Sequence, residues 1–294
     1  MKIPALVSRV ATTVFLAAAL LVPAAGAAVR TPRISPDATL VQTIGVTDVT
    51  LTFSRPGVKG RVIWGGVVPY DTTWRTGAND ATSITFTDPV TINGQPLPAG
   101  KYSFFTMPGR ETWSIIFSRQ KDLWGAYAYN PSEDALRVQA KPEAAEFTEW
   151  MDFEFDSLSA KSARLSVRWE KLRVSCNIGV DTDRLLPEKF RAAVAEAKAD
   201  DWSTPYQAAR YCFDNNVGSA EEMNAWLEKS LAVKATLGNQ GLKARVLAKA
   251  GKKAEAVALG EKAVQEEKAR TLKAGETRAN TSALEKSIAE WKGK

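Results

Sequence analysis

The sequence predicts a multidomain chain in which an antiparallel β-sandwich is followed by an α-helical, repeat-like domain. Three observations carry this prediction. Apolar and polar residues alternate with a period of two between about residues 46 and 180. Turn-forming residues separate these alternating segments. After Asp183 the alternation gives way to alanine-rich segments with helix start signals. We therefore expect a β-sandwich over 46–183 and a helical domain over 184–294, preceded by a linker over 28–45.

The first residues predict a secretory signal peptide over 1–27. Lys2 and Arg9 precede an apolar run over 10–22, and Pro23 and a string of small residues follow it. The run is shorter than the roughly 20 residues that span a bilayer. We therefore expect cleavage near Ala27, a periplasmic or secreted protein, and no membrane anchor after cleavage.

Alternating strands account for the β part. The segments around Leu51, Ile84, Ile115, Phe153 and Leu165 each place apolar side chains on one face and polar ones on the other. Asn93-Gly94 predicts a tight hairpin turn between two of the strands. About nine short strands without intervening helices favour an antiparallel sandwich or barrel.

Six helices are expected in the second part. Pro187 is a candidate helix start, and Thr204-Pro205 predicts a cap followed by a proline in the first turn. Ser219 with Glu222 predicts a capping box. Three further helices are expected at 242–250, 254–269 and 282–291.

A faint repeat runs through the helical part. Glu228 and Leu231 match Glu261 and Val264 at a spacing of 33 residues, which is typical of helix–turn–helix repeats. The segment 242–256 resembles a tetratricopeptide repeat, in which small residues let paired helices approach closely. An ordinary alanine-rich helical hairpin is the alternative. A repeat domain implies a protein partner at the helical part.

Composition excludes several classes of function. Histidine is absent, which rules out a Ser-His-Asp triad, a Cys-His dyad and any His-ligated metal site. No glycine-rich stretch completes a nucleotide-binding fingerprint, and Gly57-Val58-Lys59-Gly60 lacks the flanking helices of an RNA-binding KH loop. The formal net charge is +6. Residues 28–183 nevertheless hold 17 basic and 18 acidic residues. We expect no cofactor, no metal and no nucleic-acid partner.

Cys176 and Cys212 are the two cysteines of the chain. Cys176 is in phase with apolar neighbours of a predicted strand, so we expect its side chain in the core. Two buried thiols and a disulfide that joins the two parts are both compatible with an oxidising compartment.

The stretch from Ser54 to Asn79 combines cations, glycines and tryptophans in a region expected to be a loop. Arginine can grip a carboxylate or phosphate with two hydrogen bonds, and tryptophan offers a face to a sugar ring. A further aromatic group, including Tyr127, lies in a Gly/Ala-containing segment. The candidate ligand-binding residues are Arg55, Lys59, Arg61, Trp64, Trp74, Arg75, Asn79, Trp124 and Tyr129.

Several of these motifs together resemble a known family. The strings S-R-P-G-V-K-G-R-V-I-W-G-G-V-V-P-Y, L-P-A-G-K-Y-S-F-F-T-M-P and W-S-I-I-F-S occur in the order found in a bacterial exported family, catalogued as domain of unknown function 2911. The resemblance covers about residues 31–181. It implies an exported β domain with a tetratricopeptide-like extension, and it implies no catalytic residue.

These observations favour a non-catalytic binding protein of the cell envelope, with an anionic or carbohydrate-like small ligand. Two alternatives stay open. One is a metal-independent hydrolase or lyase that acts on an envelope carbohydrate through Asp/Glu, Lys or Tyr, and it predicts carboxyl groups beside Arg55 and Arg75. The other is a purely structural interaction protein, with the tryptophans buried and the arginines braced internally.

Overall fold

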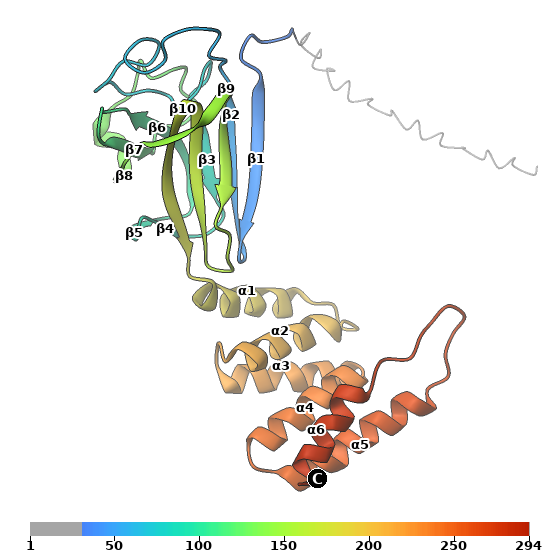
Figure 1. Ribbon diagram of the computed structural model, residues 1–294. Coiled ribbons are helices and arrows are strands. Elements are labelled where there is room, and N and C mark those ends of the chain that lie inside the picture. The colour runs from blue at the N-terminus through green and yellow to red at the C-terminus, as the bar shows by residue number, and fades with distance from the viewer. Residues whose placement is uncertain (1–30, 294) are drawn as a thin grey trace, which may run out of the picture. The chain divides into compact units, whose positions relative to one another are not determined.

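The computed structural model describes residues 31–293. The expected signal peptide, 1–27, lies outside the described residues. Residues 34–294 form one compact unit. Among these residues, ten strands come first and six α-helices follow. Figure 1 shows this order of strands and helices along the chain. The structure therefore confirms the predicted fold class, an antiparallel β part followed by a helical part.

The strands form two antiparallel sheets. The larger sheet has the order β1-β2-β3-β6-β7-β8, and the smaller one has the order β5-β4-β10-β9. The strands of the larger sheet are β1 (Asp37–Ile44), β2 (Thr47–Ser54), β3 (Ser83–Phe86), β6 (Gly100–Met107), β7 (Trp113–Ser118) and β8 (Asp134–Ala140). Those of the smaller sheet are β4 (Val90–Ile92), β5 (Gln95–Leu97), β9 (Glu143–Asp156) and β10 (Ser162–Val180). A short 3₁₀ turn, Pro131–Glu133, precedes β8.

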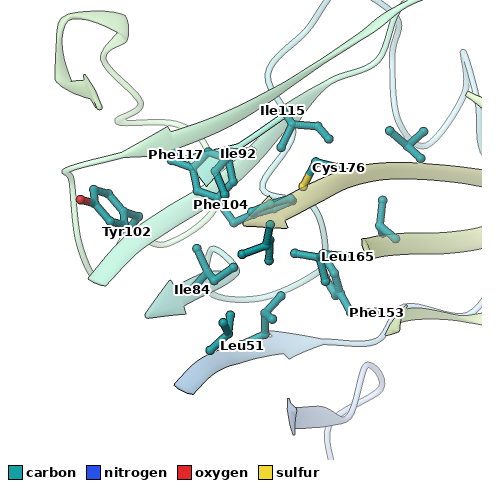
Figure 2. Packing of buried hydrophobic residues seen from close by; sticks show 14 of the residues in the cluster. Leu51, Ile84, Ile92, Tyr102, Phe104, Ile115, Phe117, Phe153, Leu165 and Cys176 are labelled. Atoms are coloured by element: carbon teal, nitrogen blue, oxygen red, sulfur yellow. The ribbon is translucent and has the colours of Figure 1, made fainter. Parts of the chain in front are cut away.

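One apolar core joins the inner faces of the two sheets. Leu51, Ile84 and Phe104 of the larger sheet pack in the same buried cluster as Phe153 and Leu165 of the smaller one (Figure 2). In β2 and β3 alternate residues are buried because successive side chains point to opposite faces of a strand, whereas β6 is buried on both faces over residues 102–106. The period-two pattern of the sequence thus becomes the packing of a sandwich.

Local turn chemistry sets the β4–β5 hairpin. Asn93 and Gly94 both have positive φ angles, +48° and +81°. A two-residue turn of this kind needs positive φ at both positions, where asparagine and glycine are the most tolerant residues. The predicted hairpin is confirmed.

Strand β1 lies inside the segment 28–45, for which the sequence predicts a linker. Its eight residues pair antiparallel with β2 from Asp37↔Ser54 to Ile44↔Thr47. The strand is at the edge of its sheet, and Val41 is exposed on it. An apolar residue on the outer face, Val41, and a polar one on the inner face, Gln42, interrupt the alternation in the sequence although burial alternates along the strand.

The helices are α1 (Thr182–Glu196), α2 (Ser203–Asn215), α3 (Ala220–Val233), α4 (Leu237–Lys249), α5 (Lys253–Ala269) and α6 (Ser282–Trp291). Helix α2 packs on α3, and α4 packs on α5. The matched segments at Glu228 and Glu261 fall on the second helix of each pair, α3 and α5. The repeat in the sequence therefore corresponds to two successive helical hairpins.

Helix starts differ from the sequence predictions at three places. Helix α1 begins at Thr182 because the Asp181 side chain caps it, and Pro187 lies inside the helix. Helix α2 begins at Ser203, because the Asp201 carboxylate accepts the Ser203 and Thr204 backbone N–H groups at 2.8 and 3.0 Å. Helix α4 begins at Leu237, five residues earlier than expected.

Side chains next to the helix starts also cap α4 and α3. Thr236 and Asn239 form a reciprocal capping box at the start of α4. Ser219 accepts the backbone N–H groups of Glu221 and Glu222 at the start of α3, as expected for a cap.

Both cysteines are buried free thiols. Cys176 lies in the sandwich core and Cys212 in the helical core. The prediction that Cys176 faces the core is confirmed. Of the two alternatives for the cysteines, a disulfide or two buried thiols, the structure has the two buried thiols.

Among the described residues, no helix combines the length and apolar character that crossing a membrane requires.

Candidate functional site

The candidate residues come mainly from one long loop, residues 55–82, which connects β2 to β3. Backbone hydrogen bonds hold both of its ends. The Val58 N–H donates to Glu149 O at 2.8 Å, and the Met151 N–H donates to Pro56 O at 2.9 Å, so the first end pairs with β9. Near the other end, Trp74 and Thr106 exchange two bonds of 2.7 and 3.0 Å with β6. The loop is thus fixed to both sheets.

Arg55 and Arg61 brace the first end of the loop. Arg55 Nε donates to Met151 O at 2.9 Å, and its Nη2 lies 3.1 Å from Asp152 Oδ2. Arg61 donates to the carbonyl oxygens of Val58 and Gly57. These guanidinium groups donate to backbone carbonyl oxygens of the loop and of β9, so they brace the loop.

Lys59 lies beside an aromatic ring of β9. Its ammonium group is 5.7 Å from the centroid of the Trp150 ring, and its backbone N–H donates to Glu149 Oε1 at 2.9 Å. Trp150 is partly exposed. Sequence reasoning did not single out Trp150 as a site residue, because its position on a strand gave no sign that a loop from the other sheet would reach it.

Trp64 and Trp74 lie in a group of four tryptophans. Trp74 stacks on Trp169 of β10 with centroids 5.8 Å apart, and Trp64 meets Trp113 of β7 edge-on at 4.9 Å. Trp74 Nε1 donates to Gly77 O, whereas the Nε1 atoms of Trp64 and Trp113 are buried without a partner among the described residues. The four rings attach the loop to the core from both sheets.

Asn79 is also held internally. It has a positive φ of +56°, and its side-chain amide donates to Ser35 O and Ser54 Oγ, each at 3.1 Å. Asparagine tolerates this backbone region better than other side chains do. The residue thereby ties the loop to the start of β1 and the end of β2.

Arg75 differs from the other cations of the loop. It is half-buried, and its Nε is buried without a hydrogen-bond partner among the described residues. Residues 80 and 81 pair with the segment 121–130. The Ala81 N–H donates to Leu123 O, and Asp80 forms an isolated antiparallel β-bridge with Trp124. This brings Arg75 close to an aromatic segment that follows β7.

Two exposed aromatic rings lie at this place. Trp124 is 62% exposed and Tyr127 is 88% exposed. Gly125, with a φ of +70°, lies between them, and a β-carbon there would be 2.9 Å from the Tyr127 ring and 3.7 Å from Arg75 Nη1. Only glycine leaves room for this approach. We call Arg75, Trp124, Gly125 and Tyr127 the Arg75 surface.

Tyr129 lies near this segment but serves another purpose. Its hydroxyl is 2.9 Å from both carboxylate oxygens of Asp134 and accepts from Arg137 Nη2 at 2.8 Å. Burial, together with the negative Asp134, raises the pKa of Tyr129 to about 12. The side chain therefore fixes the start of β8.

The nine candidate residues thus divide into separate groups instead of forming one cluster. Arg55, Arg61 and Asn79 hold the loop by hydrogen bonds, while Trp64 and Trp74 pack on the core. Arg75 lies beside Gly125, in the same short segment as the exposed rings of Trp124 and Tyr127. The Gly/Ala-rich composition around Tyr127 was the sequence signal for its part in the surface.

The carboxyl groups of the β part are mostly paired. Asp152 faces Arg55, and Glu154 lies 3.1 Å from Arg168. Asp156 accepts two hydrogen bonds from Arg164. These two bonds hold the pKa of the Asp156 carboxyl below its usual value. Among residues 31–293, no group of three or more Cys, Asp or Glu side chains is placed to hold a metal ion.

Comparison with known proteins bears on the β part alone. No curated protein and no solved structure matches the chain. The family model that matches does not extend to the helices, so the tetratricopeptide-like interpretation of the helical part stays a prediction. Residues 35–178, which include both sheets and the long loop, match the family model described as "Protein of unknown function (DUF2911)", and this match supports the assignment of the β part to that family.

Proposed function

We propose that the β part binds a small anionic or carbohydrate-like ligand at the Arg75 surface. One observation supports this most directly: Arg75 is half-buried, its Nε has no acceptor among the described residues, and it lies beside Gly125 in the segment that carries the exposed rings of Trp124 and Tyr127. A buried donor without an acceptor is unfavourable by about 1–3 kcal/mol. A ligand oxygen that reaches Arg75 would remove that penalty.

The chemistry of the three side chains suggests what the ligand carries. A guanidinium group binds a carboxylate or phosphate through two parallel hydrogen bonds. The faces of Trp124 and Tyr127 suit the apolar face of a sugar ring. A sugar that carries an acidic group would use all three side chains, and a sugar acid is therefore the first compound to test.

A thermal-shift panel tests the proposal. We expect glucuronate, glucose 6-phosphate or inorganic phosphate to raise the melting temperature of the wild type, and glucose to raise it less. Arg75→Ala should abolish the shift. Arg110→Ala is the matched control, because Arg110 is an exposed arginine that stacks on Tyr70 elsewhere in the β part. A panel in which no compound stabilises the wild type would remove the basis of the proposal.

We further propose that binding takes place outside the cytoplasm. The charged, apolar and small-residue segments over 1–28 support this. Mass spectrometry of the protein from the native cell envelope should find an N-terminus near Ala28, and a chain that retains Met1 would contradict export by cleavage. A protein partner at the helical part stays a prediction.

A further inference from the structure

A cavity in the helical part is lined by Gln240, whose buried side-chain oxygen has no hydrogen-bond partner among the described residues. The cavity has a volume of about 340 Å³ and lies among the start of α2, the α3–α4 turn and the end of α5. Gln240 of α4 lines it and is 4% exposed, and its Oε1 has no hydrogen-bond partner among the described residues. Buried side-chain oxygens without a partner are uncommon in folded proteins.

The orientation of the Gln240 amide is determined by its neighbour. Gln240 Nε2 donates to Glu266 Oε2 at 2.8 Å. A flipped amide would place its oxygen against the carboxylate, and two acceptors would then repel each other. The unpartnered atom is therefore the amide oxygen Oε1, and any group that forms a hydrogen bond with it must be a donor.

The other residues that line the cavity favour a positively charged donor. Glu266 supplies a carboxylate next to Gln240; it is exposed, and its Oε1 lies 3.7 Å from Lys262 Nζ. Trp202 and Tyr206 supply aromatic faces. The Trp202 ring already lies 5.8 Å from the ammonium group of Lys234, which shows that an ammonium group can reach this ring. Arg270, the other cation that lines the cavity, is paired with Glu267 and Glu276.

An anion does not fit the same set of groups. Lys234 and Arg270 could attract one, but an anion offers no proton to Gln240 Oε1 and would face Glu266. We propose that this cavity binds a small primary amine, whose ammonium group donates to Gln240 Oε1 and Glu266. A volume of about 340 Å³ is at the lower end of the range for ligand pockets and suits a compound of a few carbon atoms.

The experiment uses n-butylamine as the probe and 1-butanol as its uncharged counterpart. The indole N–H resonance of Trp202, assigned with Trp202→Phe, is followed in a ¹H–¹⁵N spectrum of the mature protein. We expect saturable shifts with butylamine and at least tenfold weaker binding of butanol. Gln240→Met should weaken butylamine binding at least tenfold, and Gln265→Met, an exposed glutamine on α5, should leave it unchanged.

A second variant covers the case in which Gln240→Met does not fold. Glu266→Gln keeps a neutral acceptor at an exposed position, and it should weaken butylamine binding at least tenfold while butanol binding changes less. Absence of saturable butylamine binding by the wild type would overturn the proposal. Equal binding of butanol, or unchanged butylamine binding in both variants, would also overturn it.

Discussion

Tyr129 and Cys176 show how burial in the β part changes ionisable side chains. The Tyr129 hydroxyl is partly buried and faces Asp134, so its anion would be poorly solvated and would lie next to a negative charge. The Cys176 thiol is surrounded by the sandwich core, and burial raises its pKa to about 12. Both groups are held in their neutral form at physiological pH.

The raised pKa of Tyr129 predicts a loss of stability in alkali. The unfolded chain ionises this tyrosine near pH 10, whereas the folded chain keeps the proton up to about pH 12. The favourable contribution is thus complete below pH 10 and is lost as pH rises from 10 to 12. Urea unfolding across this range should show a flatter decline for Tyr129→Phe than for the wild type. Equal slopes would contradict the contacts described for this hydroxyl.

The two buried thiols predict slow reaction with a thiol reagent. A thiolate is the reactive species, and burial disfavours it at both cysteines. At pH 8, Ellman's reagent should label neither cysteine quickly in the folded protein and both in guanidinium chloride. Fast labelling of the native protein, or fewer than two thiols after unfolding, would show that the thiols are not buried and free.

At the scale of elements, the long loop depends on its tryptophans. Trp64 and Trp74 pack on Trp113 and Trp169 from strands of opposite sheets. A loop of this length would otherwise lose much conformational entropy without compensation. Packing of the loop on the core thus fixes the backbone next to Arg75, which follows Trp74 in the chain.

Two substitutions separate the core tryptophans from the surface one. Trp74→Ala removes a stacked ring and its bond to Gly77, and truncation of a large aromatic side chain costs about 3 kcal/mol or more of unfolding free energy. Trp124→Ala removes a ring that is 62% exposed, so we expect a change within about 0.5 kcal/mol. Urea denaturation of both variants measures the difference. Similar losses for the two would contradict the assignment of their roles.

The elements that the sequence predicted well depend on local chemistry. The Asn93-Gly94 turn and the Ser219 cap need residues that are neighbours in the chain, and both were predicted. Strand β1 was missed because apolar Val41 faces outward and polar Gln42 faces inward, which interrupts the alternation in the sequence. The start of α2 was misplaced because the Asp201 carboxylate, and not the Thr204 hydroxyl, accepts the first N–H groups of the helix.

At the scale of the whole molecule, the candidate site was harder to predict than the fold. The alternation of apolar residues determines that two sheets share a core, and it can be read along a single strand. The division of nine candidate residues into bracing, core and surface groups depends on which strands lie next to the loop. Arg55 meets Asp152, and Trp74 meets Trp169, across more than 90 residues of chain. No local pattern contains that information.

The charge distribution favours a local binding surface over a general affinity for polyanions. The β part is nearly neutral, and most of its arginines are paired with carboxylates or backbone carbonyls. Arg75 is the cation next to the exposed rings whose Nε lacks a partner among the described residues. Specificity should therefore come from geometry at one place and not from net charge.

Calorimetric titration of the protein with glucuronate and with glucose tests the central claim most directly. We predict saturable binding of glucuronate, weaker binding of glucose, and at least a tenfold loss of glucuronate affinity in Arg75→Ala, since a charge-assisted hydrogen bond is worth about 1.5–3 kcal/mol. Trp124→Ala should weaken both sugars. Equal glucuronate affinity for wild type and Arg75→Ala, with both variants folded, would contradict the claim that the Arg75 surface is the binding site.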